Sequence, residues 1–156
     1  MKRKHLIVII SLLAALCALC AFAVMVNAAE TVVYVDAKGG SDSNNGTSAA
    51  SAFKTLDAAY KKLADDGGKI VLTSDYTLAA DYTTPEYKGQ VTLISKHNGD
   101  EYGGRIVVTK ACYFNLKGSM ILRDLTVKTE LTVQNGLTFV CNFNPIVFDD
   151  GYKLES

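Results

Sequence analysis

The second half of the chain is organised as short apolar runs separated by residues that form turns. The runs lie at residues 70–72, 91–94, 106–108, 113–116, 120–122, 125–127, 131–133, 137–140 and 146–148. The turn formers between them are Asn98-Gly99, Gly103-Gly104, Gly118, Asn135-Gly136 and Asp149-Asp150-Gly151. Many short strands at such close spacing predict an all-β fold, either a sandwich or a solenoid.

One segment favours the solenoid. Residues 114–127 (FNLKGSMILRDLTV) place apolar side chains in short bursts, split by Gly118 and by Arg123-Asp124. Strands of a sandwich hairpin usually alternate over a longer stretch. A coil of a parallel β-helix instead turns apolar residues inward several times within roughly 20 to 30 residues. The pattern therefore predicts the first coils of a parallel β-helix.

The region before these runs predicts a strand, a loop and a helix. β-branched residues at 31–35 (TVVYV) indicate the strand, and the polar, glycine-containing stretch 36–51 indicates the loop. Apolar residues then recur at helical spacing, at Phe53, Leu56, Ala59, Tyr60 and Leu63. Thr55 is the expected N-cap of a helix over 53–64, which Gly67-Gly68 end. Since the first coil of a solenoid has an open apolar end, we expect this helix to cover it.

The first 28 residues have the organisation of a secretory leader. Basic residues at 2–4 precede an apolar run over 6–26, and Val26 and Ala28 suit cleavage after Ala28. The alternative is an uncleaved anchor, because about 20 apolar residues cross a bilayer as a helix. In both cases residues 29–156 are exported by the general secretory route, secreted or held at the cell surface. The leader is then the only predicted contact with the membrane.

Composition narrows the function of the exported part. Without the leader, 13 Lys and Arg stand against 16 Asp and Glu, a net charge of −3, which gives no electrostatic basis for binding nucleic acid. The length suits one small domain. Export permits a disulfide between Cys112 and Cys141, while buried free thiols are an equal alternative. The oligomeric state is not specified by any pattern in the sequence.

Residues 34–63 form a recognisable series, which is a short strand, a Gly-Ser-Asp-x-x-x-Gly-Thr loop and a Phe-x-Thr helix, and Gly-Gly follows it. The residues that carry it are Tyr34, Gly40, Ser41, Asp42, Gly46, Thr47, Phe53, Thr55 and Ala59. The series resembles the N-terminal opening of secreted bacterial right-handed parallel β-helix proteins of the pectate-lyase-like class. Ala52 departs from the proline that often precedes the Phe. A later stretch, 137–151 (LTFVCNFNPIVFDDG), resembles β-helical regions in large surface proteins of Gram-positive anaerobes.

The resemblance implies a right-handed parallel β-helix with an N-terminal capping helix, and it leaves the activity open. The chain stops at Leu154-Glu155-Ser156 without a polar capping element. Because solenoids need a cap at both ends, we expect residues 29–156 to be the N-terminal part of a longer, truncated β-helix domain.

The polar loop offers oxygen ligands for a hard cation. Asp36, Asp42 and Asn44 are the candidate calcium ligands, since calcium takes six to eight oxygens. The spacing fails the EF-hand pattern, because Phe53 occupies the position of the bidentate Glu. Turns closed by Asx side chains are the preferred interpretation of these residues. No other cofactor is predicted.

A polysaccharide lyase of this fold class would need a base with a lowered pKa and a cation or arginine to neutralise a uronate carboxylate. The available bases are Arg105, Lys110, Lys117 and Arg123, and the available carboxylates are Asp75, Asp81, Asp100 and Glu101. They form no recognisable cluster in the sequence, so we interpret them as solvated charges at strand corners. No catalytic residue is therefore predicted, and His97 is expected in a turn at Asn98-Gly99.

Tyrosine is the residue type that most suggests binding, because a flat aromatic face stacks on sugar rings and the phenol forms hydrogen bonds. The candidate ligand-binding residues are Tyr76, Tyr82, Tyr87 and Tyr102. Tyrosine is also common in strands, which is the structural alternative.

Three functions follow from these features. The first is a non-catalytic secreted or cell-surface β-helix module that is glycan-associated or architectural. The second is the opening of a polysaccharide lyase or glycosidase whose active site lies in coils absent from this chain. The third is a surface adhesin. The first is preferred, and polysaccharide is the expected partner.

Overall fold

A computed structural model describes residues 30–129, 137–141 and 146–155. All described helices and strands belong to the compact unit Thr31–Ser156. The predicted leader, the apolar run 131–133 and the Asn135-Gly136 turn lie outside the described residues. None of the helices formed by the described residues has the length and apolar composition needed to cross a bilayer.

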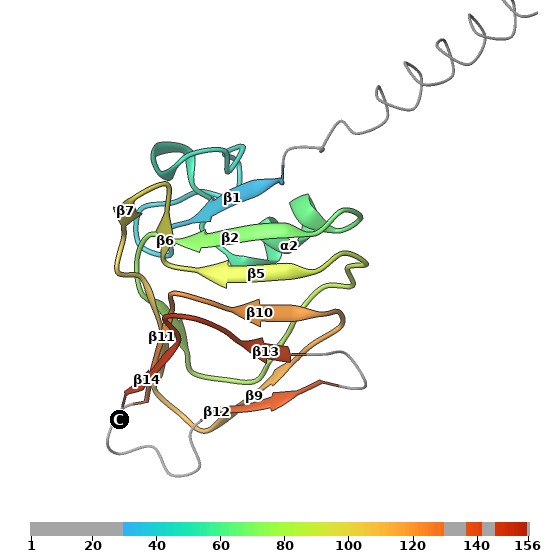
Figure 1. Cartoon of the computed structure of the whole chain (residues 1–156), viewed down its shortest axis with the longest axis vertical. Helices are drawn as coiled ribbons and strands as arrows, with labels where there is room; N and C mark the ends of the chain where they lie inside the picture. The colour runs from blue at the N-terminus through green and yellow to red at the C-terminus, as the bar shows by residue number, and fades with distance from the viewer. Residues whose placement is uncertain (1–29, 130–136, 142–145, 156) are drawn as a thin grey trace, which may run out of the picture. The chain divides into compact units, whose positions relative to one another are not determined.

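Three parallel sheets make up most of the unit, which confirms the all-β prediction (Figure 1). Sheet A contains, in spatial order, β1 (Val32–Val35), β2 (Gly68–Leu72), β5 (Val91–Ile94), β10 (Met120–Leu122) and β13 (Ile146–Phe148). Sheet B contains β3 (Tyr76–Leu78), β8 (Arg105–Val108), β11 (Thr126–Thr129) and β14 (Lys153–Glu155). Sheet C contains β4 (Tyr82–Thr83), β9 (Cys112–Asn115) and β12 (Leu137–Val140).

The chain visits the sheets in a fixed order. It passes from β2 in sheet A to β3 in sheet B and β4 in sheet C, and then returns to sheet A at β5. Neighbouring strands of a sheet therefore come from successive passes, and equivalent residues stack above one another. In sheet A the inward column runs through Val33, Ile70, Leu93, Leu122 and Phe148.

The predicted helix is present as α2 (Leu56–Leu63), preceded by a short 3₁₀ turn, η1 (Ala49–Ser51). Thr55 is its N-cap, because the hydroxyl accepts a hydrogen bond from the amide of Ala58. Gly67 ends it with a positive φ of 73°, and its amide donates to the carbonyl of Leu63. Phe53, expected at the start of the helix, instead bridges to Val35 in the extended chain.

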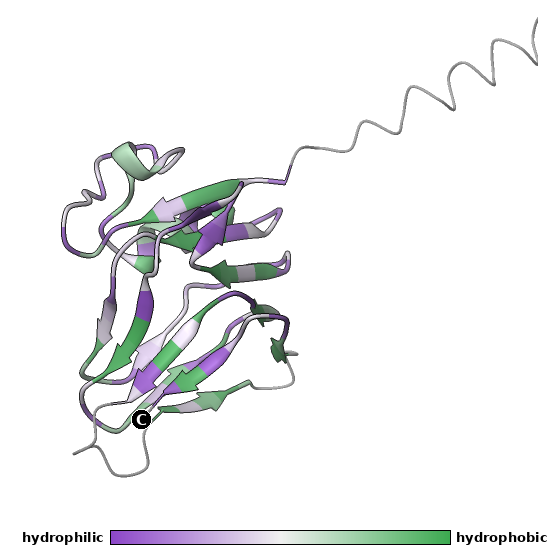
Figure 2. Cartoon of the chain, turned by 60° about the vertical axis from the view of Figure 1, so that its left-hand side comes forward, coloured by the Kyte–Doolittle hydropathy of each residue, from purple (hydrophilic) through white to green (hydrophobic). Residues whose placement is uncertain are grey.

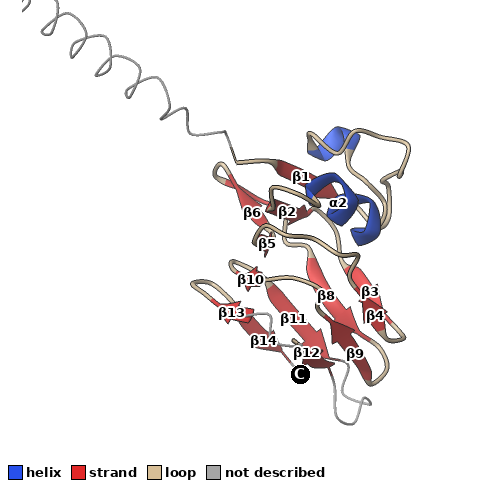
Figure 3. Cartoon of the chain, turned by 90° about the vertical axis from the view of Figure 1, so that its right-hand side faces the viewer, coloured by secondary structure: helices blue, strands red, loops and turns tan. Residues whose placement is uncertain are grey.

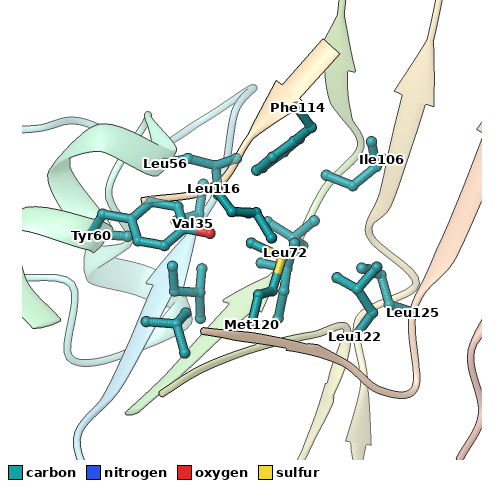
Figure 4. Packing of buried hydrophobic residues seen from close by; sticks show 14 of the residues in the cluster. Val35, Leu56, Tyr60, Leu72, Ile106, Phe114, Leu116, Met120, Leu122 and Leu125 are labelled. Carbon is teal, nitrogen blue, oxygen red and sulfur yellow. The ribbon is translucent and has the colours of Figure 1, made fainter. Parts of the chain in front are cut away.

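The apolar face of α2 packs against the core at the end of the unit where β1 lies (Figures 3 and 4). Leu56, Ala59, Tyr60 and Leu63 are its buried residues. The core continues through an aromatic series in which each ring contacts the next: Tyr82, Phe114, Phe139, Phe148 and Tyr152. Figure 2 shows that the strands carry hydrophobic residues, in some strands interspersed with polar ones. Cys112 is buried and Cys141 half-buried, and both are free thiols.

Candidate functional site

A small antiparallel hairpin interrupts the parallel arrangement between β5 and β8. Its strands are β6 (Lys96–His97) and β7 (Asp100–Glu101), joined by Asn98 and Gly99 with φ of 52° and 90°. Positive φ at both central residues is the geometry that favours an Asn-Gly turn. The predicted turn beside His97 is thus confirmed.

The hairpin lies against the outer side of sheet A. There Tyr34, Val71 and Ile94 form a column that points away from the core. Val71 and Ile94 are nevertheless 0% and 3% exposed, and β6 contacts β2 directly. The rings of His97 and Tyr102 meet the ring of Tyr34 edge to face, with centroids 6.2 and 6.0 Å away. The hairpin therefore adds an aromatic cluster to the outside of the sheet.

A polar hollow of about 350 Å³ adjoins this hairpin. Its lining combines charged side chains, hydroxyls and glycine backbone: Ser95, Lys96, Glu101, Gly103, Asp124, Thr126, Gly151 and Lys153. Successive passes of the chain supply these residues, because the Ser95 hydroxyl donates to the carbonyl of Asp124 at 2.7 Å and the amide of Asp124 donates to Asp150. The wall of the hollow is therefore formed by successive passes of the chain that lie one above another.

The charges of the hollow are partly paired. Lys96 Nζ donates to Glu101 Oε1 at 2.6 Å. This hydrogen bond raises the pKa of Lys96 and lowers the pKa of Glu101, so both groups are charged at neutral pH. Asp124 and Lys153 add one charge of each sign. The hollow offers donors and acceptors in balance, which suits a ligand rich in hydroxyl groups.

Tyr102 is the predicted binding residue that the fold places beside this hollow. It is half-buried and stands between Glu101 and Gly103, both of which line the hollow. Its hydroxyl donates to Asp100 Oδ2 at 3.3 Å. Burial and the neighbouring Tyr34 raise the pKa of Tyr102, so the phenol keeps its proton.

The other three candidate tyrosines pack beneath α2 instead. Tyr87 is 5% exposed, with its ring 5.1 Å from that of Tyr60, so it presents no face to a sugar. Tyr82 and Tyr76 are partly buried against the core, and the Tyr82 hydroxyl donates to Asp57. Burial raises the pKa of all three. Because α2 covers that part of the chain, the Tyr87 ring is not accessible for stacking in this structure.

Both carboxylates proposed for calcium accept hydrogen bonds from the loop and from residues that pack against it. Asp36 Oδ1 accepts from the amides of Lys38 and Gly39 and from the hydroxyl of Ser74. Asp42 accepts from the amides of Lys54 and Thr55 and from the Thr55 hydroxyl. Asn44 uses its amide nitrogen to donate to Ala52.

These contacts close turns and join the loop to the start of α2, as the Asx interpretation anticipates. Among the described residues no group of three or more His, Cys, Asp or Glu is placed to hold a metal ion.

The loop carboxylates make stability depend on pH. The Ser74 hydroxyl and backbone amides lower the pKa of Asp36. For Asp42, burial acts in the raising direction, but the hydrogen bonds from Thr55 and Lys54 outweigh it and the pKa falls. A lowered pKa in the folded state contributes stability above the unfolded value, about 3.9, and loses it as the pH falls through the folded pKa.

We therefore expect the thermal midpoint to fall steeply below about pH 4. Because Asp42 is exposed and screened, Asp42→Asn is expected to cost about 1 kcal/mol at pH 7 and to flatten the pH profile. Calorimetry between pH 3 and pH 7 checks this, with the exposed Asp66→Asn as the control. Equal pH profiles for Asp42→Asn and the parent chain would contradict it.

The two arginines that were candidates for a lyase base form ion pairs. Arg105 Nε and Nη2 donate to the two carboxylate oxygens of Asp75 at 3.0 and 2.8 Å, and Arg123 pairs with Asp149. These hydrogen bonds raise the pKa of both arginines, the opposite of what a base requires. Asp81 accepts from the amide of Tyr113. Lys110 and Lys117 are exposed.

Much of the hollow was missed by the sequence reasoning. Lys96 and Glu101 flank an Asn-Gly turn, a hairpin signal that would have paired them. Asp124 and Lys153 come from later passes of the chain, and no local pattern brings them to the same place.

The chain matches no known protein family, no curated protein and no solved structure. Its function is therefore argued from the geometry of its own surface.

Proposed function

We propose that this chain is a non-catalytic module of a secreted or cell-surface protein, and that it binds polysaccharide in the hollow beside Tyr102. We further propose that sheets A, B and C are the faces of a right-handed parallel β-helix. The all-parallel pairing and the fixed order in which the chain visits the three sheets support this fold. The leader at residues 1–28 supports export.

The observation that carries the binding proposal is the combination of an aromatic ring with a balanced polar hollow. A sugar presents an apolar ring face and a rim of hydroxyl groups. Tyr102 supplies an aromatic surface, while Lys96, Glu101, Asp124 and Lys153 supply donors and acceptors. The Tyr34 ring contacts the Tyr102 ring edge to face, which restricts the Tyr102 side chain before a ligand binds.

The ion pairs of the arginines support a non-catalytic role. A lyase base needs a lowered pKa, and Arg105 and Arg123 have raised ones. Their carboxylate partners, Asp75 and Asp149, lie in other passes of the chain. These pairs thus support a role in holding successive passes together.

Replacing Tyr102 by alanine is expected to weaken polysaccharide binding about fivefold, as loss of one aromatic contact costs about 1 kcal/mol. The measurement is a glycan array followed by calorimetric titration with the best oligosaccharide. Tyr113→Ala is the matched control, because Tyr113 is 53% exposed on β9 in sheet C and, unlike Tyr102, has no sequence neighbour that lines the hollow.

Two results would contradict the proposal. Equal loss of affinity in Tyr102→Ala and Tyr113→Ala would place binding elsewhere. Release of unsaturated product from a uronate polysaccharide by residues 29–156 would show that the fragment is catalytic.

A further inference from the structure

A second hollow, of about 470 Å³, lies on the outer face of sheet B. β3 and β8 contribute Thr77 and Val107 to its lining, and the loop between β1 and α2 contributes Lys38 and Lys54. Thr77 and Val107 are neighbours in the parallel ladder. The residue that follows each of them in its strand is buried, so Thr77 and Val107 point away from the core. This sheet B hollow is therefore formed by the loop and the outside of the sheet.

The side chains of the sheet B hollow suit a ligand rich in hydroxyl groups. Lys38 and Lys54 are exposed, and no salt bridge joins either of them to another residue that the structure describes. Both ammonium groups can therefore donate hydrogen bonds to a ligand, and the Thr77 hydroxyl can donate or accept. Val107 adds an apolar surface beside these polar groups.

One column of outward-facing residues connects the two hollows. Asp75 lines the sheet B hollow, and Thr126 lines the hollow beside Tyr102. Arg105 lies between them, because it pairs with Thr126 in the ladder and its backbone amide donates to Asp75 at 3.1 Å. β3, β8 and β11 are consecutive strands of sheet B (Figure 3). Since neighbouring strands lie about 4.8 Å apart, Asp75 and Thr126 are separated by about 10 Å along the column.

The surface between the hollows is polar and reachable from solvent. The side chains of Arg105 and Asp75 are 36% and 25% exposed, and their ion pair balances the charge at this point. Arg105 gives its Nε and one Nη2 hydrogen to Asp75, so the guanidinium group keeps further donors for a ligand.

We propose that one polysaccharide chain occupies both hollows and runs across β3, β8 and β11 on the outer face of sheet B. This inference rests on the proposed binding of polysaccharide beside Tyr102, and it adds a second subsite at which Lys38, Lys54 and Thr77 hold another part of the same chain. A single sugar residue cannot span the separation of the hollows, whereas an oligosaccharide can. Contact at the second subsite is then intramolecular, which raises the affinity for a long ligand.

Ligand length tests the second subsite. The best-binding glycan of the array is prepared as a disaccharide and as a hexasaccharide, and each is titrated by calorimetry. We expect the parent chain to bind the hexasaccharide at least about tenfold more tightly. Lys38→Gln/Lys54→Gln is expected to weaken hexasaccharide binding about fivefold or more and to leave the affinity for the disaccharide, which binds beside Tyr102, unchanged.

A second double variant controls for the change in net charge. Lys61→Gln/Lys62→Gln removes the same charge from the exposed side of α2, where neither lysine lines the sheet B hollow. It should keep the parent affinity for the hexasaccharide. Circular dichroism verifies that both double variants are folded.

The outcomes separate this inference from the one on which it rests. Equal affinity of the parent for the two lengths, or equal loss of hexasaccharide binding in the two double variants, would overturn the second subsite and leave binding beside Tyr102 intact. Loss of disaccharide binding in Lys38→Gln/Lys54→Gln would overturn it as well, because the two subsites would not be separate. A parent chain that binds neither length would overturn both proposals.

Discussion

Phe114→Ala is expected to lower the free energy of unfolding by about 3 to 5 kcal/mol, the range for removing a fully buried aromatic side chain. Phe114 is 1% exposed and lies between two rings of the aromatic series, with ring centroids 4.9 Å from Tyr82 and 5.6 Å from Phe139. Alanine leaves a cavity that sheet C cannot fill, because the backbones of β4, β9 and β12 are held in place by parallel pairing. Urea unfolding followed by circular dichroism measures the loss.

The neighbouring Tyr113 provides the control. It is of similar size and lies in the same strand, but its side chain points outward and is 53% exposed. Tyr113→Ala should therefore change the free energy of unfolding by no more than about 0.5 kcal/mol. A similar loss in both variants would mean that sheet C does not enclose a core as described.

The elements that the sequence predicts correctly are those with a local signal. The runs at 91–94 and 120–122 are strands with those same bounds, and α2 follows from its apolar spacing and the Thr55 cap. Strands β3 and β4 have only three and two residues and were not anticipated. These two strands exist because they pair with β8 and β9, which lie about 30 residues further along the chain. No local sequence pattern therefore encodes them.

The candidate site was predictable only in part for the same reason. Residue type alone selected Tyr102 as a candidate, because a tyrosine ring can stack on a sugar. The same criterion also selected Tyr87, which α2 and Gly118 enclose. Whether a tyrosine in a short strand faces solvent depends on which element covers that side of the sheet. That information lies in the packing of the helix, and it cannot be read from the residues around Tyr87.

Gly40→Ala is expected to destabilise the unit by about 3 kcal/mol, because the loop backbone passes too close to accept a side chain. A Cβ at Gly40 would lie 2.3 Å from the carbonyl oxygen of Phe53 and 2.5 Å from that of Asp36. Both contacts are with backbone, so neither can move aside as a side chain would. The same backbone carries the hydrogen bonds from Gly40 to Asp36 and from Asp36 to Phe53, which hold the loop on the edge of β1.

Gly39→Ala is the control that distinguishes this clash from a general effect of alanine in the loop. A Cβ at Gly39 would meet only the carboxylate of Asp36, at 3.0 Å for Oδ2, and that side chain can shift. Gly39→Ala is therefore expected to cost less than about 1 kcal/mol. Thermal unfolding of both variants by differential scanning calorimetry gives the comparison. Since the loop closes the β1 edge, Gly40→Ala should also expose that edge.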